Sequence, residues 1–565
     1  LNTTVAPLFF ADQFLQISTS LPSRFISGLG EHLTPLVLDT AWTRVTLWNR
    51  DMAPVVWSGA EGKGDGSSAL AGATHGLLSC SSGARPSPDV LLQPSPALTW
   101  RTTGGILDFY IFLGPDPKSV VRQYLDVVGR SQVLPGSLWL KAAMGGLMGS
   151  PCGAGSHGGV WGDPLLPEHR YCHTQDVQWN DLDYADAKRD FTFNKKSFRD
   201  YPEMVQDFHR RGLRYIMIVV SDTPGRAGAP AGVGWHRVVL CGAFPIPSSL
   251  PQVWPGPTVF PDFTNPETHE WWYDMVKDFH DQVPFDGMWI VSGPGRAAGC
   301  GSPAPALHLC WALVRQGAAP FPPLLSPSPP RTCPSRIPER RPPFLPALSK
   351  HPPPASPLQP QEPYAFSPAA QAAMRNALRL RYSLLPFLYT LFHRAHSAGE
   401  TVARPLFLEF PKDPNTWAVD RQLMWGGGLL VTPVLEAGQT KVSGYFPAGT
   451  WYSLAGDSTI HSKGQWILLP APLDTINVHV RAGHILPLQE PAFSTAESRN
   501  KGMALVVALT PDGFARGDLF WDDGESWQTF EKGDYTEILF LATNVSEGGQ
   551  LLRASAHLDG VLLEA

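Results

Sequence analysis

Two predicted strands differ in the residues that come after their carboxyl ends. The run Val177–Asp181 is a strand candidate that ends in carboxylates, Asp181 and then Asp183. The run Phe285–Ile290 is short and apolar, is led in by Asp-Gly, and is typical of a buried parallel strand. In α/β barrels the catalytic side chains stand after the carboxyl ends of such strands. The next residues, Val291–Pro294, contain no ionisable group, so the second strand is predicted to carry no chemistry.

Composition excludes several classes of function. The chain has 565 residues, a formal net charge of −6 and no basic stripe, which argues against nucleic acid as a partner. No apolar run approaches the roughly 18 residues that a membrane span requires. The seven Cys include no C-x-x-C spacing, and the group His169, Cys172 and His173 has irregular flanks. Neither a metal site nor a cofactor is therefore predicted.

Periodicity divides the chain into ordered segments and irregular intervals. Helices are predicted at 117–128, 198–212, 266–282 and 368–398, the last one bent at Pro386. Buried strands are predicted at 214–220 and 285–290, and further β segments include Thr401–Phe410 and Met503–Leu509. The irregular intervals include 301–360, where eighteen Pro exclude helix and strand alike.

The order strand, helix, strand, helix, strand predicts βαβ units in a parallel sheet. The predicted fold class is multidomain α/β plus all-β. An N-terminal β-sandwich, interrupted at about 54–89, is followed by an incomplete (β/α)8 barrel and by C-terminal β-sandwich domains. The predicted boundaries are 1–129, 130–398, 399–490 and 491–565, and irregular segments at 130–175, 221–251 and 291–360 interrupt the barrel.

Several motifs, in order along the chain, resemble glycoside hydrolase family 31. They are Trp179-Asn180-Asp181-Leu182-Asp183-Tyr184, Pro261-Asp262-Phe263-Thr264-Asn265-Pro266, Phe285-Asp286-Gly287-Met288-Trp289-Ile290 and Trp521-Asp522-Asp523-Gly524-Glu525-Ser526. The resemblance covers most of 1–53, 90–129, 176–220, 252–290 and 361–545. All seven Cys lie in the intervals that it leaves out. We therefore interpret those intervals as frame-shifted, intronic or otherwise unrelated sequence; the alternative is rapid divergence of loops.

The resemblance implies a retaining glycosidase, which uses one carboxylate as nucleophile and another as acid/base. The family places its nucleophile at the Asp directly after Trp-Ile, a position occupied here by Val291. Its acid/base Asp stands in a Trp-x-Gly-Asp context on a later strand. The similar group Trp161–Asp163 comes too early in the chain and lies in an irregular interval. No catalytic residue is therefore predicted.

The resemblance also implies a sugar contact, because the family binds glucose hydroxyls through the position of Asp181. Asp181, Asp183 and Trp179 are the predicted substrate-binding residues, and an α-glucan or oligosaccharide is the predicted ligand. The competing interpretation is a solvated strand end, which we favour because pockets need several convergent polar groups. Glycosylation is predicted at Asn2 and Asn544 if the chain is secreted.

Three functions remain open. The first is a catalytically inactive family 31 α-glucosidase-like protein, the second an active retaining α-glucosidase for which this sequence is a faulty gene model, and the third a non-catalytic carbohydrate-binding protein. The resemblance implies a lysosomal or secretory route. Leu1–Thr4 shows neither the basic start nor the apolar region of a signal peptide, so a cytoplasmic or retained chain is expected if it is translated as written.

Overall fold

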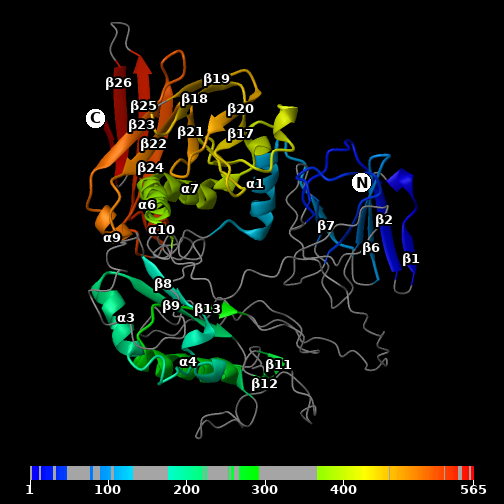
Figure 1. Ribbon diagram of the computed structural model, residues 1–565. Coiled ribbons are helices and arrows are strands. Elements are labelled where there is room, and N and C mark those ends of the chain that lie inside the picture. The colour runs from blue at the N-terminus through cyan, green and yellow to red at the C-terminus, as the bar shows by residue number, and fades with distance from the viewer. Residues whose placement is uncertain are drawn as a thin grey trace. The chain divides into compact units, whose positions relative to one another are not determined.

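The structure is a computed structural model. It describes residues 3–11, 14–29, 34–47, 77–79, 89–103, 107–131, 176–220, 223–224, 252–253, 256–259, 266–291, 366–456, 458–526, 528–544, 550–558 and 561–564. The chain divides into two compact units (Figure 1), one formed by Leu1–Leu140 with Ala372–Ala565 and the other by Lys141–Gln371.

The second unit contains a parallel three-stranded sheet. Its strands are β8 (Val177–Asn180), β9 (Arg214–Val220) and β13 (Gly287–Val291). β9 lies between the other two and is parallel to both. The connections contain α3 (Tyr201–Arg210) and α4 (Pro266–Gln282). The predicted strand–helix order and the parallel pairing are thus confirmed.

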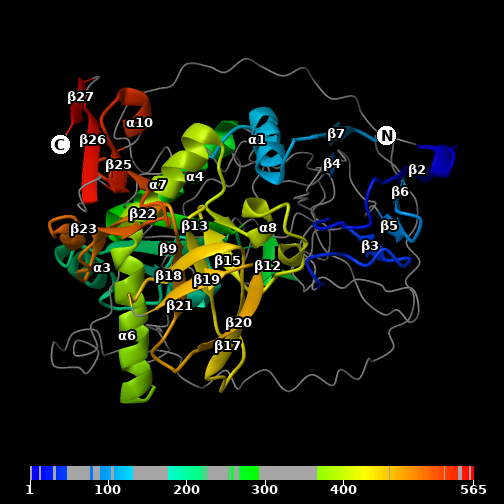
Figure 2. The same cartoon turned by 90° about the horizontal axis from the view of Figure 1, so that it is seen from above.

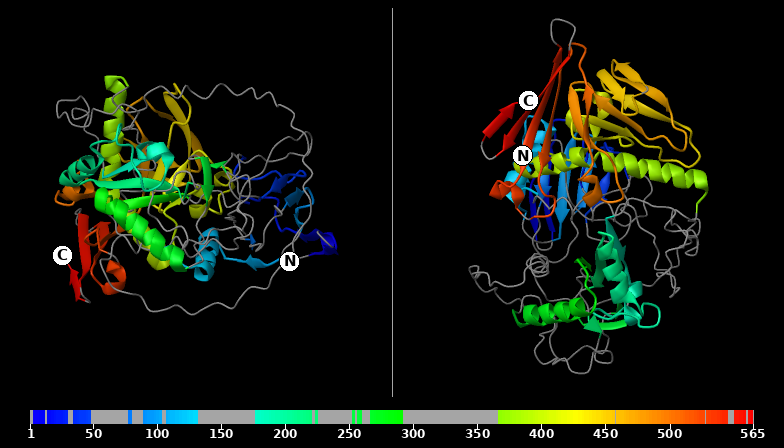
Figure 3. Two further views of the ribbon diagram at one scale, coloured as in Figure 1. Left: turned by 90° about the horizontal axis from the view of Figure 1, so that it is seen from below. Right: turned by 90° about the vertical axis from the view of Figure 1, so that its left-hand side faces the viewer.

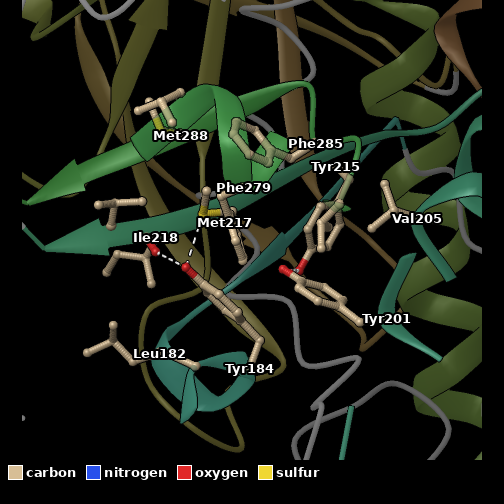
Figure 4. Packing of buried hydrophobic residues seen from close by; sticks show 14 of the residues in the cluster. Leu182, Tyr184, Tyr201, Val205, Tyr215, Met217, Ile218, Phe279, Phe285 and Met288 are labelled. Atoms are coloured by element: carbon tan, nitrogen blue, oxygen red, sulfur yellow. Dashed lines mark hydrogen bonds between the residues drawn. The ribbon is translucent and has the colours of Figure 1, made fainter. Parts of the chain in front are cut away.

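Both helices pack against the sheet through one hydrophobic core (Figure 4). Tyr215 and Met217 of β9 meet Tyr201 of α3 and Phe279 of α4 in this core, and all four side chains are at most 1% exposed. The hydroxyls of Tyr201 and Tyr215 lie 2.8 Å apart. Burial raises the pKa of both tyrosines well above its usual value, so both hydroxyls stay protonated and their mutual hydrogen bond is retained. A further small antiparallel sheet has the order β10 (Thr223–Pro224), β12 (Gly256–Val259), β11 (Gln252–Val253).

The N-terminal part of the first unit is mostly one antiparallel sheet. Its order is β1 (Phe9–Ala11), β2 (Phe14–Ser20), β6 (Ala97–Thr102), β5 (Asp89–Gln93), β3 (Arg44–Thr46), and β4 (Leu77–Ser79) pairs separately with β7 (Phe109–Ile111) (Figure 2). Helix α1 (Pro117–Val128) comes next in the chain. The Asp116 carboxylate caps it by accepting from the backbone N–H groups of Lys118 and Ser119.

The C-terminal part of the first unit contains three sheets. The first has the order β14 (Ala403–Arg404), β15 (Leu423–Trp425), β16 (Leu429–Thr432), β21 (Asn477–Arg481), β18 (Gly449–Ser453), β19 (Thr459–Ser462). Beside it, β17 (Lys441–Phe446) pairs with β20 (Gln465–Pro470). The third sheet has the order β23 (Met503–Ala508), β22 (His484–Gln489), β24 (Ala515–Trp521), β25 (Thr536–Asn544), β26 (Gln550–Leu558), β27 (Val561–Glu564). Short helices α9 (Thr495–Ser498) and α10 (Thr529–Lys532) stand between its strands.

The predicted helix 368–398 is two helices, α6 (Pro368–Ser383) and α7 (Leu385–Ala398), seen as the yellow-green pair in Figure 3. They meet at Leu384, two residues before the Pro386 at which a bend is predicted. Leu384, Phe387 and Leu391 share a core with Leu429 of β16 and Leu486 of β22. These helices thus pack on the C-terminal strands.

One predicted strand is wrong. Thr401–Phe410 is predicted as a β segment, whereas only β14 is extended and α8 (Leu406–Glu409) is helical. Leu406 and Leu408 are both buried, so the apolar residues are in the core but the period is not that of a strand. The buried ion pair between Arg404 and Glu409 joins the strand to the helix, a contact that apolar residues alone do not indicate.

Candidate active site

The carboxyl ends of the three parallel strands bring the predicted site positions to one edge of the sheet. Asp181 directly follows β8, and β13 ends at Val291. Val291 pairs with Val220, the last residue of β9, and Asn180 pairs with Met217. The strand before the family's nucleophile position is therefore formed up to that position.

The register also places these positions on one face. Trp179 pairs with Ile216, which in turn pairs with Gly287. Because alternate positions of a strand share a face, positions 179 and 291 lie on the face of Ile216, opposite to Tyr215 and the helices. Trp289 belongs to this face and is 39% exposed, which is high for a side chain in the position of a barrel interior.

Asp181 makes a local contact. Its carboxylate accepts from the backbone N–H of Leu182 at 2.6 Å and caps the short 3-10 helix η3 (Leu182–Tyr184). The side chain is half-buried, and Asp183 within η3 is exposed. A carboxylate has four lone-pair sites, so Asp181 retains capacity to accept from sugar hydroxyls. The Trp179 side chain lies outside the described residues.

Sequence reasoning missed the residue that holds this loop. The Tyr184 hydroxyl donates to the backbone carbonyl of Ile218 at 2.6 Å and lies 3.1 Å from Met217 Sδ (Figure 4). Tyr184 is fully buried, and burial raises its pKa well above the usual value, so the hydroxyl stays protonated as a donor. The Asp181 loop is thereby fixed to β9. The only sequence signal for this role is a Tyr in a polar loop. The sequence does not indicate that the Ile218 carbonyl is its hydrogen-bond partner.

The opposite end of the sheet contains a fully partnered carboxylate, which sequence reasoning also missed. Asp286, directly before β13, accepts from the Tyr215 N–H at 2.7 Å and from Arg214 Nη1 at 3.1 Å, and its other contact is His209 Nε2 at 2.8 Å. The carboxylate is 16% exposed. Asp286 therefore ties together the end of α3 and the starts of β9 and β13, which is a structural role.

The other predicted positions are only partly described. Asn2 and Trp161–Asp163 lie outside the described residues, as does the side chain of Asn544 at the end of β25. Among the residues that the structure describes, no three His, Cys, Asp or Glu are grouped to hold a metal ion. No described helix is long and apolar enough to cross a membrane.

Two family profiles match the chain. The Glycosyl hydrolases family 31 TIM-barrel domain matches residues 172–295 and 343–391, and the Glycosyl hydrolase family 31 C-terminal domain matches residues 399–486. The break in the barrel match, between 295 and 343, comes shortly after β13. This break coincides with most of the Pro-rich irregular interval.

Relatives and solved structures agree with the profiles. The lysosomal alpha-glucosidase of Bos taurus is 46% identical over 680 residues, covering 99% of this chain and 71% of the relative, and that of Rattus norvegicus is 44% identical over 702 residues, covering 99% and 71%. Both matches are longer than the 565 residues of this chain, so they include stretches of the relative that this chain lacks. The fold is similar to that of a Flavobacterium johnsoniae GH31 dextranase complexed with glucose, with a TM-score of 0.70, 15% identity and coverage of 98% of this chain and 77% of that one. This chain belongs to glycoside hydrolase family 31.

Proposed function

We propose that the chain as translated is an α-glucosidase-like member of family 31 that does not hydrolyse glycosides. The observation that carries this proposal is Val291 at the end of β13, in the position where the family has its nucleophile. A valine side chain has no lone pair with which to attack an anomeric carbon or to stabilise an oxocarbenium ion. No Asp or Glu comes after it until Glu339, so no neighbouring carboxylate along the chain replaces it.

The expected loss of rate is large. Retaining enzymes need two carboxyl groups about 5–5.5 Å apart, and the sequence places none at the nucleophile position. Removing a covalent nucleophile from a hydrolase costs roughly 10⁴-fold to 10⁶-fold in turnover. The acid/base segment is also missing, and its absence lowers whatever rate remains.

The proposal includes a truncated barrel. We place an N-terminal β-sandwich at 1–129, the incomplete barrel at 130–398, and C-terminal β domains at 399–490 and 491–565. Two findings support the truncation: the barrel profile is interrupted between 295 and 343, and the matches to relatives are longer than the chain. The exposure of Trp289 on the interior face agrees with strands that are missing from that side.

Residual sugar binding is proposed for the carboxyl end of β8. Asp181, with Asp183 and Trp179, would contact an α-glucan or oligosaccharide through the acceptor capacity that Asp181 retains. Similarity to lysosomal alpha-glucosidases supports a lysosomal or secretory route, on which Asn2 and Asn544 would be glycosylated.

Hydrolysis of a chromogenic α-glucoside at acidic pH tests the proposal. The purified chain is expected to release the chromophore at the rate of the buffer blank, while the bovine relative serves as positive control. Saturable turnover by the chain that disappears in Asp181→Asn would refute it, because such turnover needs a working site at this sheet edge.

A second function, an active retaining α-glucosidase made from a differently spliced transcript, is favoured by a specific observation. The dipeptide Val-Ser occurs at both places where a family segment ends. Val220-Ser221 follows a segment that ends at Val220, and Val291-Ser292 comes directly after a segment that ends at Ile290. Val220 and Val291 pair with each other in the sheet. Every Val codon begins with GT, and Ser has codons that begin with AG. Introns commonly begin with GT, a purine and then AGT. Translated in frame, these six nucleotides encode Val followed by Ser.

The residues directly before each new family segment resemble the translated end of an intron. Introns commonly end in a pyrimidine-rich tract followed by CAG, which in frame encodes Pro, Leu, Ser and Phe followed by Gln. The stretch Phe244–Pro251 precedes Gln252, where a family segment resumes, and Pro352–Leu358 precedes Gln359, two residues before the segment that resumes at position 361. Gln175 likewise stands directly before Asp176. We infer that these intervals are retained introns.

Sequencing the transcript across the codons for residues 216–256 and 286–364 distinguishes the two functions. Retained introns predict a shorter spliced transcript whose Ile290 codon is followed by Asp and then by the remaining barrel segments. If only the unspliced form is found, the second function fails and the inactive protein stands.

A further inference from the structure

We propose that the β17–β20 hairpin carries a second carbohydrate-binding site, a surface platform for an α-glucan built around Trp466. This proposal takes its ligand class from the proposed function, but it does not depend on whether the barrel site is active. Trp466 on β20 is 56% exposed. Its cross-strand partner on β17 is Tyr445, which is only 1% exposed.

The Tyr445 ring supports the Trp466 ring. It meets the Tyr445 ring edge-on, with centroids 5.5 Å apart and an interplanar angle of 62°. An edge-to-face contact of this kind fixes the orientation of a ring. Trp466 therefore presents a positioned aromatic surface, and flat indole rings pack well against the apolar faces of pyranose sugars.

Polar groups surround the hydroxyl of Tyr445, the residue on which the Trp466 ring packs. The Tyr445 hydroxyl donates to Asp413 Oδ2 at 2.6 Å and accepts from Asn415 Nδ2 at 3.2 Å. Asn415 Nδ2 also contacts Asp413 Oδ1 at 3.0 Å. Asn415 is exposed and Asp413 half-buried. The two N–H groups of the Asn415 amide are used within this group, so Asp413 and the amide oxygen of Asn415 remain as acceptors for sugar hydroxyls, which donate.

A glycine leaves space beside these polar groups. Gly464 has a φ of +92°, and a Cβ atom at this position would lie 3.0 Å from the Tyr445 hydroxyl and 3.9 Å from Asp413 Oδ2. Any other residue would therefore cover the Asp413–Tyr445–Asn415 group and strain the turn before β20. One fixed, exposed ring beside a few polar acceptors can contact both the apolar face and the hydroxyls of a pyranose sugar.

Affinity electrophoresis of the full chain in native gels that contain glycogen tests the platform, since aggregated chain does not enter such gels. Trp466→Ala removes the ring that packs on the sugar and is expected to weaken glycogen binding at least about tenfold, which corresponds to about 1.4 kcal/mol. Trp466→Phe is expected to recover part of this loss. Leu468→Ala is the matched control, because Leu468 is 63% exposed and lies two residues along the same strand face.

Three results would overturn the proposal. They are unchanged retardation of Trp466→Ala, an equal loss in Leu468→Ala (which would indicate a general apolar surface), and equal binding of a cello-oligosaccharide and maltoheptaose in solution. Thermal unfolding of each variant is measured alongside. Because Trp466 is mostly exposed, its replacement should leave the melting temperature nearly unchanged, so lost binding is read as a lost contact. Hydrolysis of the chromogenic α-glucoside is measured separately. If the chain did hydrolyse it, the proposed loss of activity would be refuted, and the glycogen-binding result would still stand.

Discussion

The two ends of the parallel sheet β8–β9–β13 carry carboxylates in opposite circumstances. At the amino end, Asp286 contacts three nitrogen groups from α3 and β9. At the carboxyl end, Asp181 accepts from the N–H of its chain neighbour Leu182, and Val291 stands where the family has its nucleophile. In α/β barrels the amino end serves stability and the carboxyl end chemistry. Under the proposed function, this chain has kept the residues of the first and lost those of the second.

That difference makes the proposed loss of the reaction compatible with a recognisable fold. The contacts that define β8, β9 and β13 come from the helix face and the amino end, where Tyr215 is completely buried. Val291 contributes its backbone to the pairing of β13 with Val220 of β9, which any residue that can stand in a strand would do. We therefore propose that valine at this position removes the reaction and keeps this part of the fold.

The largest predicted effect is a loss of stability at low pH around His393, which belongs to the first unit. His393 of α7 is 5% exposed and stacks on Phe520 with centroids 3.9 Å apart. Burial first, and then His396 and Arg394, lower the pKa of His393 from 6.5 to about 4, against an opposing effect of Glu531. The unfolded state binds a proton below pH 6.5 that the folded state takes up only near pH 4. The contribution of neutral His393 to the free energy of unfolding is thus fully present above pH 6.5. About 3 kcal/mol of it is lost as the pH falls from 6.5 to 4.

Hydrogen exchange of peptides from α7 and β24 between pH 4 and 7 measures this loss, after correction for intrinsic rates. The replacement His393→Phe keeps the stacked ring, removes the titrating group and should flatten the pH dependence. A pH slope that survives in His393→Phe would assign the effect to other groups. The sheet β8–β9–β13 belongs to the other unit and serves as the internal reference.

The next effect tests the amino end of the sheet directly. Asp286→Ala removes the partner of His209, Arg214 and the Tyr215 N–H, and is expected to destabilise the sheet by about 2 to 3 kcal/mol. Exchange protection of peptides from β9 and β13 reports this change. Asp281→Ala is the matched control, because Asp281 pairs on the surface with Lys277 and such exposed pairs contribute below about 1 kcal/mol. Equal effects of the two variants would contradict the structural role of Asp286.

A smaller effect is expected from Tyr184→Phe, which deletes the hydroxyl bound to the Ile218 carbonyl. The loss should be about 1 to 2 kcal/mol, because the carbonyl is left without this donor in a buried position. Protection should fall most in the peptide that contains Asp181. If protection stays unchanged there, the loop after β8 is not held by Tyr184.

The smallest effect is expected at the carboxyl end itself. Asp181→Asn should change stability by no more than about 0.5 kcal/mol, because Asn caps a helix about as well as Asp. The same exchange measurement applies. A loss comparable to that of Asp286→Ala would erase the contrast between the two ends of the sheet.

Much of this fold could be predicted from the sequence, and the limits have physical causes. The apolar runs at 214–220 and 285–290 and the helical spacing at 266–282 report burial within one element, and these elements formed as predicted. The partners of Asp286 and Tyr184 depend on which strands lie side by side, which no local pattern records. At Thr401–Phe410 the apolar residues indicated a strand where α8 forms. The Val291 position could be found only through the family motif, since the residues after Ile290 carry no chemical signal of their own.

The most direct test of the lost nucleophile is covalent trapping with a fluorinated glucosyl fluoride that forms long-lived glucosyl–enzyme esters in retaining α-glucosidases. Intact mass analysis of the full chain after incubation measures the label, with the bovine relative labelled in parallel. The chain is predicted to gain no mass while the relative is labelled stoichiometrically. A stoichiometric glucosyl adduct on an Asp or Glu of this chain would contradict the account.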